Sequence, residues 1–417
     1  MNEKIEWGTV DQNGLIHIPK KFMDQMGFKP GAKFRILLDN NHLEVSQSIY
    51  QLKKIYIEPT NRCNLNCTMC IRHSWQENSG NMSEETFSAI LTGLDQFDPV
   101  PSISFSGLGE PLSHPNIIDW VTRVKQKGAN VELITNATML DKKMSQDLIK
   151  AGLDVLWVSI DGATTENFND VRQGAQLSEV IHNVQQFRGL RHGGHHPHPQ
   201  IGIAFVAMKD NISDLPKVMQ LARSMGAKLF SASNVMPYTA EMVPQMLYTN
   251  ALKNITYLSS DWLPQASLPK LDLDLPEAQE SFIQALNSGW NIDLSGHPLS
   301  GSNDICRFIA NGSTSIAWDG GISPCWPLMH THTSFLHNKP HISYRHVIGY
   351  LQNATLFDLW HEQEYVEYRR KVQDFSFAPC TFCGGCDLSV ENMEDCLGNP
   401  FPACGTCLWS QGIIQCP

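Results

Sequence analysis

Short apolar runs alternate with segments of helical period between residues 50 and 240. The runs are rich in β-branched residues and lie at residues 54–58, 102–106, 131–135, 155–160, 200–206 and 229–235. The segments between them are typical of amphipathic helices and lie at residues 83–97, 115–127, 141–150, 178–190 and 212–225. Strand–helix alternation predicts parallel strands joined by right-handed crossovers. We therefore expect an α/β chain in which residues 51–240 form a partial (β/α)6 barrel.

Residues suited to chemistry follow the ends of the predicted strands. They are Cys63, Cys67 and Cys70 after the first, Gly107, Gly109 and Glu110 after the second, Thr135 and Asn136 after the third, and Ser159 and Asp161 at the fourth. Any one of these loops could be an ordinary turn, because Gly, Asn and Asp are common in turns. Together they predict an active site, because the carboxyl ends of barrel strands meet at one rim.

Cys63, Cys67 and Cys70 form a C-x3-C-x2-C run directly after the first predicted strand. Three thiolates at this spacing can hold a cubane iron–sulfur cluster, but a fully protein-ligated cluster takes four cysteines. One iron would stay open, and an open metal position is where a small molecule can bind. The alternative is a zinc site of three cysteines completed by His73.

Composition narrows the context of this metal chemistry. The chain has 417 residues, which is long enough for two or three domains. It has no apolar stretch of about 18 residues and no signal-peptide pattern, so we expect a cytoplasmic protein without a membrane partner. Twelve cysteines in a reducing compartment indicate metal ligands rather than disulfides. A net charge of −11 disfavours nucleic acid as the main partner.

Residues 1–50 read as a small separate module. Short strand patterns with turn signals at Asn13-Gly14 and Lys29-Pro30-Gly31 surround one short apolar helical face. The string from Gly14 to Gly31 resembles the AbrB/MazE swapped-hairpin family, whose members are commonly DNA-binding dimers. Positive and negative charges balance in this module, so we expect a homodimer contact or substrate docking rather than DNA binding.

The C-terminal part of the chain is rich in cysteine. Residues 241–300 read as a connecting segment, and residues 301–417 contain Cys306, Cys325, Cys380, Cys383, Cys386, Cys396, Cys404, Cys407 and Cys416. Nine cysteines exceed what two zinc sites need. The start of this region and an expected helix near residues 355–372 resemble the SPASM domain, which implies two auxiliary [4Fe–4S] clusters. Eight thiolates with one spare, or seven with an open iron, both remain consistent with the sequence.

Residues 50–240 resemble the radical S-adenosylmethionine (SAM) superfamily. The resemblance rests on the three-cysteine run, on Gly107 to Pro111, and on the stretch from Ser159 to Gly174. It implies a [4Fe–4S] cluster whose open iron is chelated by SAM. The SAM contacts that it implies are Met69, Gly107, Gly109, Glu110, Thr135, Asn136, Ser159, Asp161 and Arg172. Glu110 would meet the SAM ammonium, Ser159 and Asp161 its ribose side, and Arg172 its carboxylate. Met69 stands where the family usually has an aromatic residue against adenine, and its thioether can also cover a ring.

The whole-chain pattern looks most like the maturases associated with tungsten-cofactor oxidoreductases. That resemblance implies an oxygen-sensitive radical SAM enzyme that reductively cleaves SAM to a 5′-deoxyadenosyl radical and modifies a peptide or protein. The substrate would be a small precursor peptide or a tungsten oxidoreductase, with ferredoxin or flavodoxin as the electron donor. Trp326 stands where sulfatase-maturating relatives have an aspartate base, and the sequence assigns no catalytic side chain. Two alternatives remain: modification of a small-molecule cofactor such as a pterin, and a DNA-binding iron–sulfur redox regulator.

Overall fold

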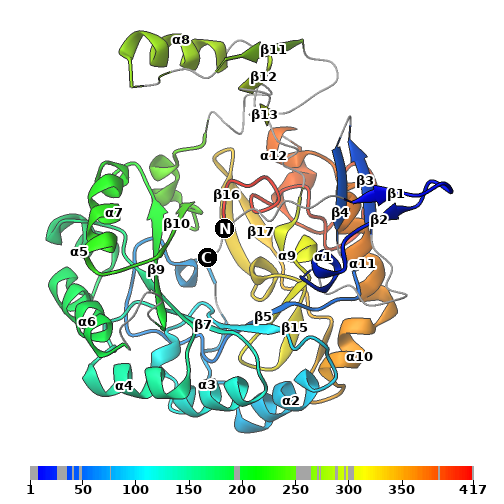
Figure 1. Cartoon of the computed structure of the whole chain (residues 1–417). Helices are drawn as coiled ribbons and strands as arrows, with labels where there is room; N and C mark the ends of the chain where they lie inside the picture. The colour runs from blue at the N-terminus through cyan, green and yellow to red at the C-terminus, as the bar shows by residue number, and fades with distance from the viewer. Residues whose placement is uncertain are drawn as a thin grey trace.

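The computed structural model describes residues 8–25, 35–39, 42–46, 49–75, 77–191, 198–249, 264–269, 272, 274–286, 290–294, 297–298, 305–383 and 386–415. Its largest element is a nine-stranded sheet in the order β10-β9-β8-β7-β6-β5-β14-β15-β18. The sheet curves into an open barrel, and the helices of the barrel region lie on its outer face (Figure 1).

The six predicted barrel strands are confirmed, and each begins at the predicted residue. They are β5 (Lys54–Ile57), β6 (Ser102–Phe105), β7 (Val131–Thr135), β8 (Val155–Ser159), β9 (Gln200–Ala207) and β10 (Leu229–Asn234). Neighbouring strands in this series pair in parallel and in chain order. All their carboxyl ends therefore lie at one rim, where the loops that follow them can meet.

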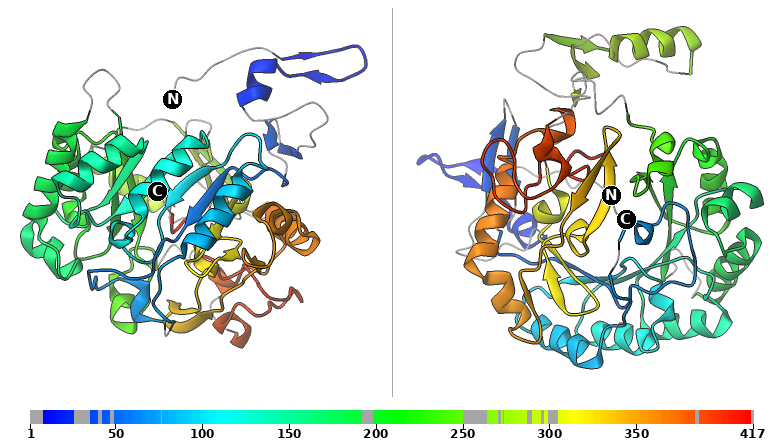
Figure 2. Two further views of the ribbon diagram at one scale, coloured as in Figure 1. Left: turned by 90° about the horizontal axis from the view of Figure 1, so that it is seen from below. Right: turned by 180° about the vertical axis from the view of Figure 1, so that it is seen from behind.

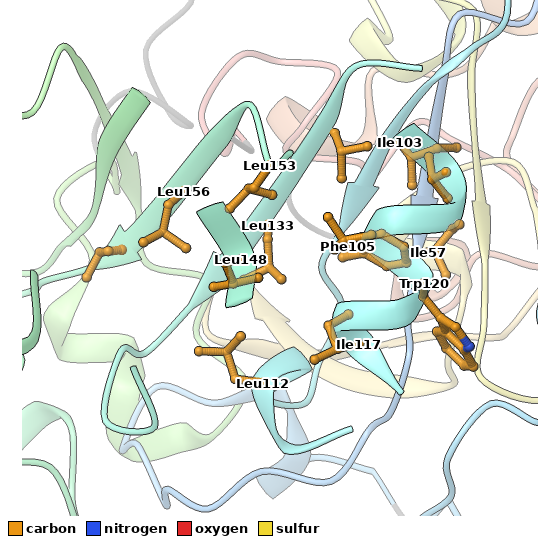
Figure 3. Packing of buried hydrophobic residues seen from close by; sticks show 14 of the residues in the cluster. Ile57, Ile103, Phe105, Leu112, Ile117, Trp120, Leu133, Leu148, Leu153 and Leu156 are labelled. Atoms are coloured by element: carbon orange, nitrogen blue, oxygen red, sulfur yellow. The ribbon is translucent and has the colours of Figure 1, made fainter. Parts of the chain in front are cut away.

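Helices cover the outer face of these strands. The predicted ones are α2 (Glu84–Leu94), α3 (Ile117–Gln126), α4 (Lys142–Ala151), α6 (Leu177–Leu190) and α7 (Leu215–Ser224), and a short unpredicted helix, α5 (Thr165–Val171), follows β8. The Ser83 hydroxyl caps α2 by accepting a hydrogen bond from the Thr86 amide at 3.2 Å. Figure 3 shows side chains of α3 and α4 packed against the strands. Trp120 and Phe105 are fully buried there, and a buried side chain of this size contributes roughly 1.5–3 kcal/mol.

The sheet does not end with the predicted barrel. Strand β14 (Ser313–Ile316) pairs in parallel with β5, and β15 (Gly321–Ser323) and β18 (Gly349–Tyr350) extend the sheet by antiparallel pairing. The expected domain boundary at residue 300 therefore does not separate two sheets. The sequence pattern hides β14 because its Ser-Thr-Ser-Ile stretch is polar, although all four residues are buried.

The expected single helix near residues 355–372 is two helices. They are α10 (Leu356–His361) and α11 (Gln363–Asp374), and Glu362 between them has an extended backbone. The break brings the rings of Trp360 and Tyr365 edge to face, with the Arg369 guanidinium 3.7 Å from the centroid of the Trp360 ring. The aromatic pair and this cation–π contact offset the interrupted helical hydrogen bonding.

The other elements are short. The N-terminal module contains α1 (Lys20–Gln25) and two hairpins, β1 (Thr9–Val10) with β2 (Ile16–His17) and β3 (Arg35–Asp39) with β4 (His42–Ser46) (Figure 2). The connecting segment contains β11 (Gln265–Leu268), α8 (Pro276–Leu286), β12 (Asn291–Leu294) and β13 (His297–Pro298). The C-terminal region adds α9 (Arg307–Ala310), β16 (His332–Leu336), β17 (Lys339–Ser343) and α12 (Cys380–Cys383). Among the residues placed by the structure, no helix is both long and apolar enough to cross a membrane.

Candidate functional site

The sequence-predicted site residues surround one cavity of about 280 Å³ at the carboxyl rim of the barrel. Those that line it are Cys63, Cys67, Met69, Cys70, Gly107, Gly109, Glu110, Thr135, Asn136, Ser159 and Arg172. Asp161 is the one expected SAM contact that does not line the cavity. The barrel therefore brings together four loops that are far apart in the sequence.

The cysteine loop is held against the loop that carries Arg172. The Asn66 amide donates to the Gln173 carbonyl at 3.0 Å, and the Thr68 amide donates to the Val171 carbonyl at 2.9 Å. Burial raises the pKa of Cys63 and of Cys67, so these groups are thiols until a bound metal displaces their protons.

The geometry of the cysteine loop favours a cluster over zinc. His73 Nε2 lies 3.0 Å from the Cys67 carbonyl oxygen, which can only accept, so this nitrogen carries a proton and cannot bind a metal. Within the described ranges, no three His, Cys, Asp or Glu side chains meet closely enough to hold a single ion. A cubane distributes its ligands over different irons, so three thiols facing one cavity fit it better than they fit a mononuclear ion.

Arg72 is a site residue that the sequence analysis missed. Its Nε donates to Cys70 Sγ at 3.3 Å and its Nη2 donates to the Leu65 carbonyl at 2.5 Å. Burial alone would lower the pKa of Arg72, but the neighbouring cysteines outweigh burial and raise it. The guanidinium therefore places positive charge beside the sulfur ligands.

Two glycines let the second loop approach the cysteine loop. Gly107 has φ +132°, a conformation that side chains rarely adopt. A Cβ on Gly109 would lie 2.3 Å from the Thr60 carbonyl oxygen, so no larger residue fits there. The Glu110 amide donates to the Arg62 carbonyl at 2.8 Å and completes this backbone contact.

The Glu110 carboxylate links the loop after β6 to the loop after β7 by hydrogen bonds. It is 2% exposed and accepts from the Thr135 hydroxyl at 2.7 Å, the Asn136 amide at 2.8 Å and the Leu112 amide at 3.0 Å. Burial outweighs these hydrogen bonds and raises the pKa of Glu110. A carboxylate has about four acceptor positions, so roughly one remains for a SAM ammonium.

Asp161 and Arg172 form a buried ion pair. The Arg172 Nε donates to Asp161 Oδ2 at 2.7 Å, and Asp161 Oδ1 accepts from the Val206 amide at 2.7 Å. Asp161 is 0% exposed and lies behind Arg172, outside the cavity. Its carboxylate therefore orients the Arg172 guanidinium, and the expected contact of Asp161 with the ribose side of SAM stays a prediction.

His330 connects the C-terminal region to the barrel. Its Nε2 lies 2.8 Å from Glu58 Oε2 and its Nδ1 contacts Glu77. Glu58 directly follows β5, and its other oxygen accepts from the Leu108 amide at 3.1 Å. Burial alone would lower the pKa of His330, but the two carboxylates outweigh burial and raise it to about 9. The imidazolium thus joins the second loop, the first strand and the C-terminal region.

We expect this contact to make stability depend on pH. The pKa of His330 is about 9 in the folded protein and roughly 6.5 when unfolded. Its contribution, up to roughly 3 kcal/mol, is therefore complete below pH ~6.5 and is lost as the pH rises through about 9. Anaerobic denaturant titrations of His330→Gln should show a smaller fall in unfolding free energy over this range than the wild-type protein. His361→Gln, which removes a ring that donates to the Phe357 carbonyl at 2.8 Å and packs against the Phe97 and Phe357 rings, should keep the wild-type fall. An unchanged fall in His330→Gln contradicts the prediction.

The described auxiliary cysteines fall into two groups of four. We call Cys306, Cys325, Cys404 and Cys407 the inner group, because these four residues pack in or against the buried apolar clusters of the C-terminal region. Burial raises the pKa of all four thiols, to about 12 for Cys306, and Cys325 also interacts electrostatically with the other three. The outer group is Cys380, Cys383, Cys386 and Cys396, and burial followed by the charges of its neighbours raises the pKa of Cys380 to about 11. Cys416 lies outside the described residues.

The C-terminal region supplies part of the wall of the cavity. Trp326, Trp409, Ile414 and Gln415 line it, and the sequence analysis did not place the last three there. The chain end is fixed to the outer strand β10, because the Asn234 side chain donates to the Ile413 carbonyl at 2.9 Å and the Gln415 amide donates to the Ser233 hydroxyl at 3.0 Å. Trp326 and Trp409 also pack in the same apolar cluster as the inner cysteine group. The two indoles therefore lie between the cavity and that group.

Comparison with known families matches both cysteine-bearing regions. Residues 57–222 match the Radical SAM superfamily, and residues 306–387 match SPASM, an iron–sulfur cluster-binding domain. The second match includes all the auxiliary cysteines up to Cys386 and ends before Cys396. Neither match covers residues 1–50, so the AbrB-like character of that module stays a prediction.

Sequence relatives cover either most of the chain or the barrel region. The tungsten-containing aldehyde ferredoxin oxidoreductase cofactor-modifying protein of Pyrococcus furiosus is 29% identical over 373 residues, which are 88% of this chain and 97% of that protein. A probable GTP 3′,8-cyclase of Methanocaldococcus jannaschii is 28% identical over 181 residues, 43% of this chain and 58% of the cyclase.

Solved structures share the fold. SuiB of Streptococcus suis, bound to its precursor peptide SuiA, superposes with a TM-score of 0.52 at 16% identity, covering 86% of this chain and 79% of SuiB. The protein anSMEcpe with bound AdoMet has the same TM-score and identity, covering 86% of this chain and 96% of anSMEcpe.

Proposed function

Because the chain is a radical SAM enzyme with a SPASM domain, and so uses SAM, a [4Fe–4S] cluster and auxiliary clusters, we propose that it modifies a peptide or protein during maturation of a tungsten-dependent oxidoreductase. When bound, SAM and a [4Fe–4S] cluster reduced by an external electron donor would supply a 5′-deoxyadenosyl radical able to remove a hydrogen atom from the substrate. Cys63, Cys67 and Cys70 hold this cluster. Arg172, oriented by Asp161, binds the SAM carboxylate, and Glu110 holds the loop that faces the SAM ammonium.

The auxiliary clusters take the two cysteine groups. The inner group holds one cluster and the outer group the other, each with four thiolates, which leaves Cys416 as the spare cysteine. This assignment selects one of the two ligand counts that the sequence left open. The inner cluster is the one nearer the cavity, because Cys306, Cys325 and Cys407 share an apolar cluster with the cavity-lining Trp326 and Trp409.

The composition of the cavity wall is the observation that carries the substrate proposal. Beyond the SAM loops, the lining includes Met236, Trp326, Trp409 and Ile414, together with the polar side chains of Tyr238 and Gln415. An apolar wall suits a side chain of a peptide better than a pterin, because a pterin carries many polar atoms that would lose their hydrogen bonds to water. Trp326 cannot act as a base, so proton removal by the residue after Cys325 is not part of the reaction.

Modification of a small cofactor is the second candidate. It is favoured by the name of the Pyrococcus relative, which is described as a cofactor-modifying protein and matches 88% of this chain. The polar side chains of Tyr238 and Gln415 at the cavity could contact such a ligand.

Transfer of deuterium should distinguish the two candidates. The reduced enzyme is incubated anaerobically with SAM and either the deuterated polypeptide of a tungsten oxidoreductase or its deuterated pterin cofactor. We expect deuterium in 5′-deoxyadenosine only in the incubation with the deuterated polypeptide and not in the incubation with the deuterated pterin, because the radical abstracts hydrogen from the bound substrate. Unlabelled polypeptide is the matched control. Deuterium transfer from the pterin alone would replace this proposal with the second candidate.

A further inference from the structure

Tyr368 places a phenol hydroxyl against one cysteine of the inner group. Its oxygen lies 3.3 Å from Cys404 Sγ. Tyr368 lies on α11, and Cys404 lies 36 residues further along the chain, after the last cysteine of the outer group. It has no part in the SAM site described above.

The direction of this hydrogen bond follows from the chemistry of a metal ligand. A free thiol could donate or accept, but a ligating cysteine is a thiolate and has no proton to donate. A phenol loses its proton only near pH ~10, so the Tyr368 hydroxyl carries a proton at neutral pH. The hydroxyl is therefore the donor whenever Cys404 binds iron.

Lys371 is a charged group near the inner cysteine group, whereas the Tyr368 hydroxyl is neutral. Lys371, one turn further along α11, places a positive charge that interacts electrostatically with Cys404. Its ammonium lies 5.1 Å from the centroid of the Phe377 ring. At the SAM site the cationic Arg72 side chain donates to Cys70 Sγ, whereas at the inner group the neutral Tyr368 hydroxyl lies against Cys404 Sγ.

We propose that Tyr368 is a positioning and tuning residue that donates a hydrogen bond to the Cys404 thiolate and thereby raises the reduction potential of the cluster held by the inner cysteine group. The inference rests on the cluster assignment given under Proposed function. Hydrogen bonds to cluster sulfurs are among the factors that set reduction potential. Reduction adds negative charge to the sulfurs, so a donor stabilises the reduced state more than the oxidised state.

The test is a redox titration of the anaerobic holoenzyme followed by electron paramagnetic resonance. Tyr368→Phe should lower the midpoint potential of one auxiliary cluster and leave the iron content, the other auxiliary cluster and the SAM cluster unchanged. Substituting Tyr368 with 3-fluorotyrosine, a stronger donor, should shift the same potential upward. Tyr365→Phe is the matched control, because it removes another buried hydroxyl from α11 that bonds to the Thr314 hydroxyl at 3.2 Å.

The outcomes separate this inference from the assignment beneath it. Cys404→Ala should alter the signal of the same auxiliary cluster that responds to Tyr368→Phe. If Cys404→Ala alters one signal but both Tyr368 variants keep the wild-type potentials, the tuning role is wrong and the cluster assignment stands. If Cys404→Ala leaves every signal unchanged, the assignment of Cys404 as a ligand is wrong. An equal shift in Tyr365→Phe would show that any lost hydroxyl on α11 has this effect, and would also overturn the inference.

Discussion

Replacing Cys63, Cys67 and Cys70 together with alanine should abolish the release of 5′-deoxyadenosine from SAM and leave the auxiliary clusters in place. The three thiols line the cavity and are the ligands that we propose for its cluster, whereas the inner and outer groups lie in the C-terminal region. Iron content should fall by roughly four atoms per chain, because one cubane is lost. Iron assays and product release under dithionite, both measured anaerobically, check these two results.

His73→Gln is the matched control for this experiment. Glutamine can still donate a hydrogen bond where the imidazole donates to the Cys67 carbonyl, but it is a poor metal ligand. We expect full iron content and product release in this variant. Loss of metal in His73→Gln would support the zinc alternative, and 5′-deoxyadenosine release by the triple variant would show that the catalytic cluster lies elsewhere.

Removing Arg172 should affect both stability and SAM binding. In Arg172→Ala, the fully buried Asp161 carboxylate loses its partner, which destabilises the fold by about 3–5 kcal/mol. The same substitution removes the charge-assisted contact that we propose with the SAM carboxylate, and it should weaken SAM binding by about 1.5–3 kcal/mol. Denaturant titration and anaerobic calorimetry measure the two effects separately.

A second substitution separates the two roles of this pair. Arg172→Ala combined with Asp161→Asn removes both charges, so stability should largely return while SAM affinity stays low. Arg172→Lys keeps the charge without the planar fork and should bind SAM with intermediate affinity. Wild-type SAM affinity in the doubly substituted protein would mean that Arg172 is not a SAM ligand. The stretch from Ser159 to Gly174 would then be aligned incorrectly with the radical SAM family.

The sequence predicted the barrel well because strand starts and helix caps depend on residues that are neighbours in the chain. Strands β5 to β10 begin at the predicted residues, and the caps at Ser83 and Asp141 start α2 and α4 where the pattern placed helices. Parallel pairing then follows from the length of each helical crossover, and it places the loop ends at one rim. Strand β14 escaped prediction because its side chains are polar, although its pairing with β5 buries them.

The sequence by itself determined the chemistry of this protein: the three-cysteine run, the glycines at positions 107 and 109, and the excess of C-terminal cysteines indicated clusters and SAM before any fold was known. Only the tertiary structure decided which side chains act together. It paired Asp161 with Arg172, grouped Cys404 with Cys306 across the outer cysteines, and brought Trp409 and Ile414 to the barrel mouth. These contacts join residues far apart in the chain, and spacing and periodicity report only on neighbours, so no local pattern contains them.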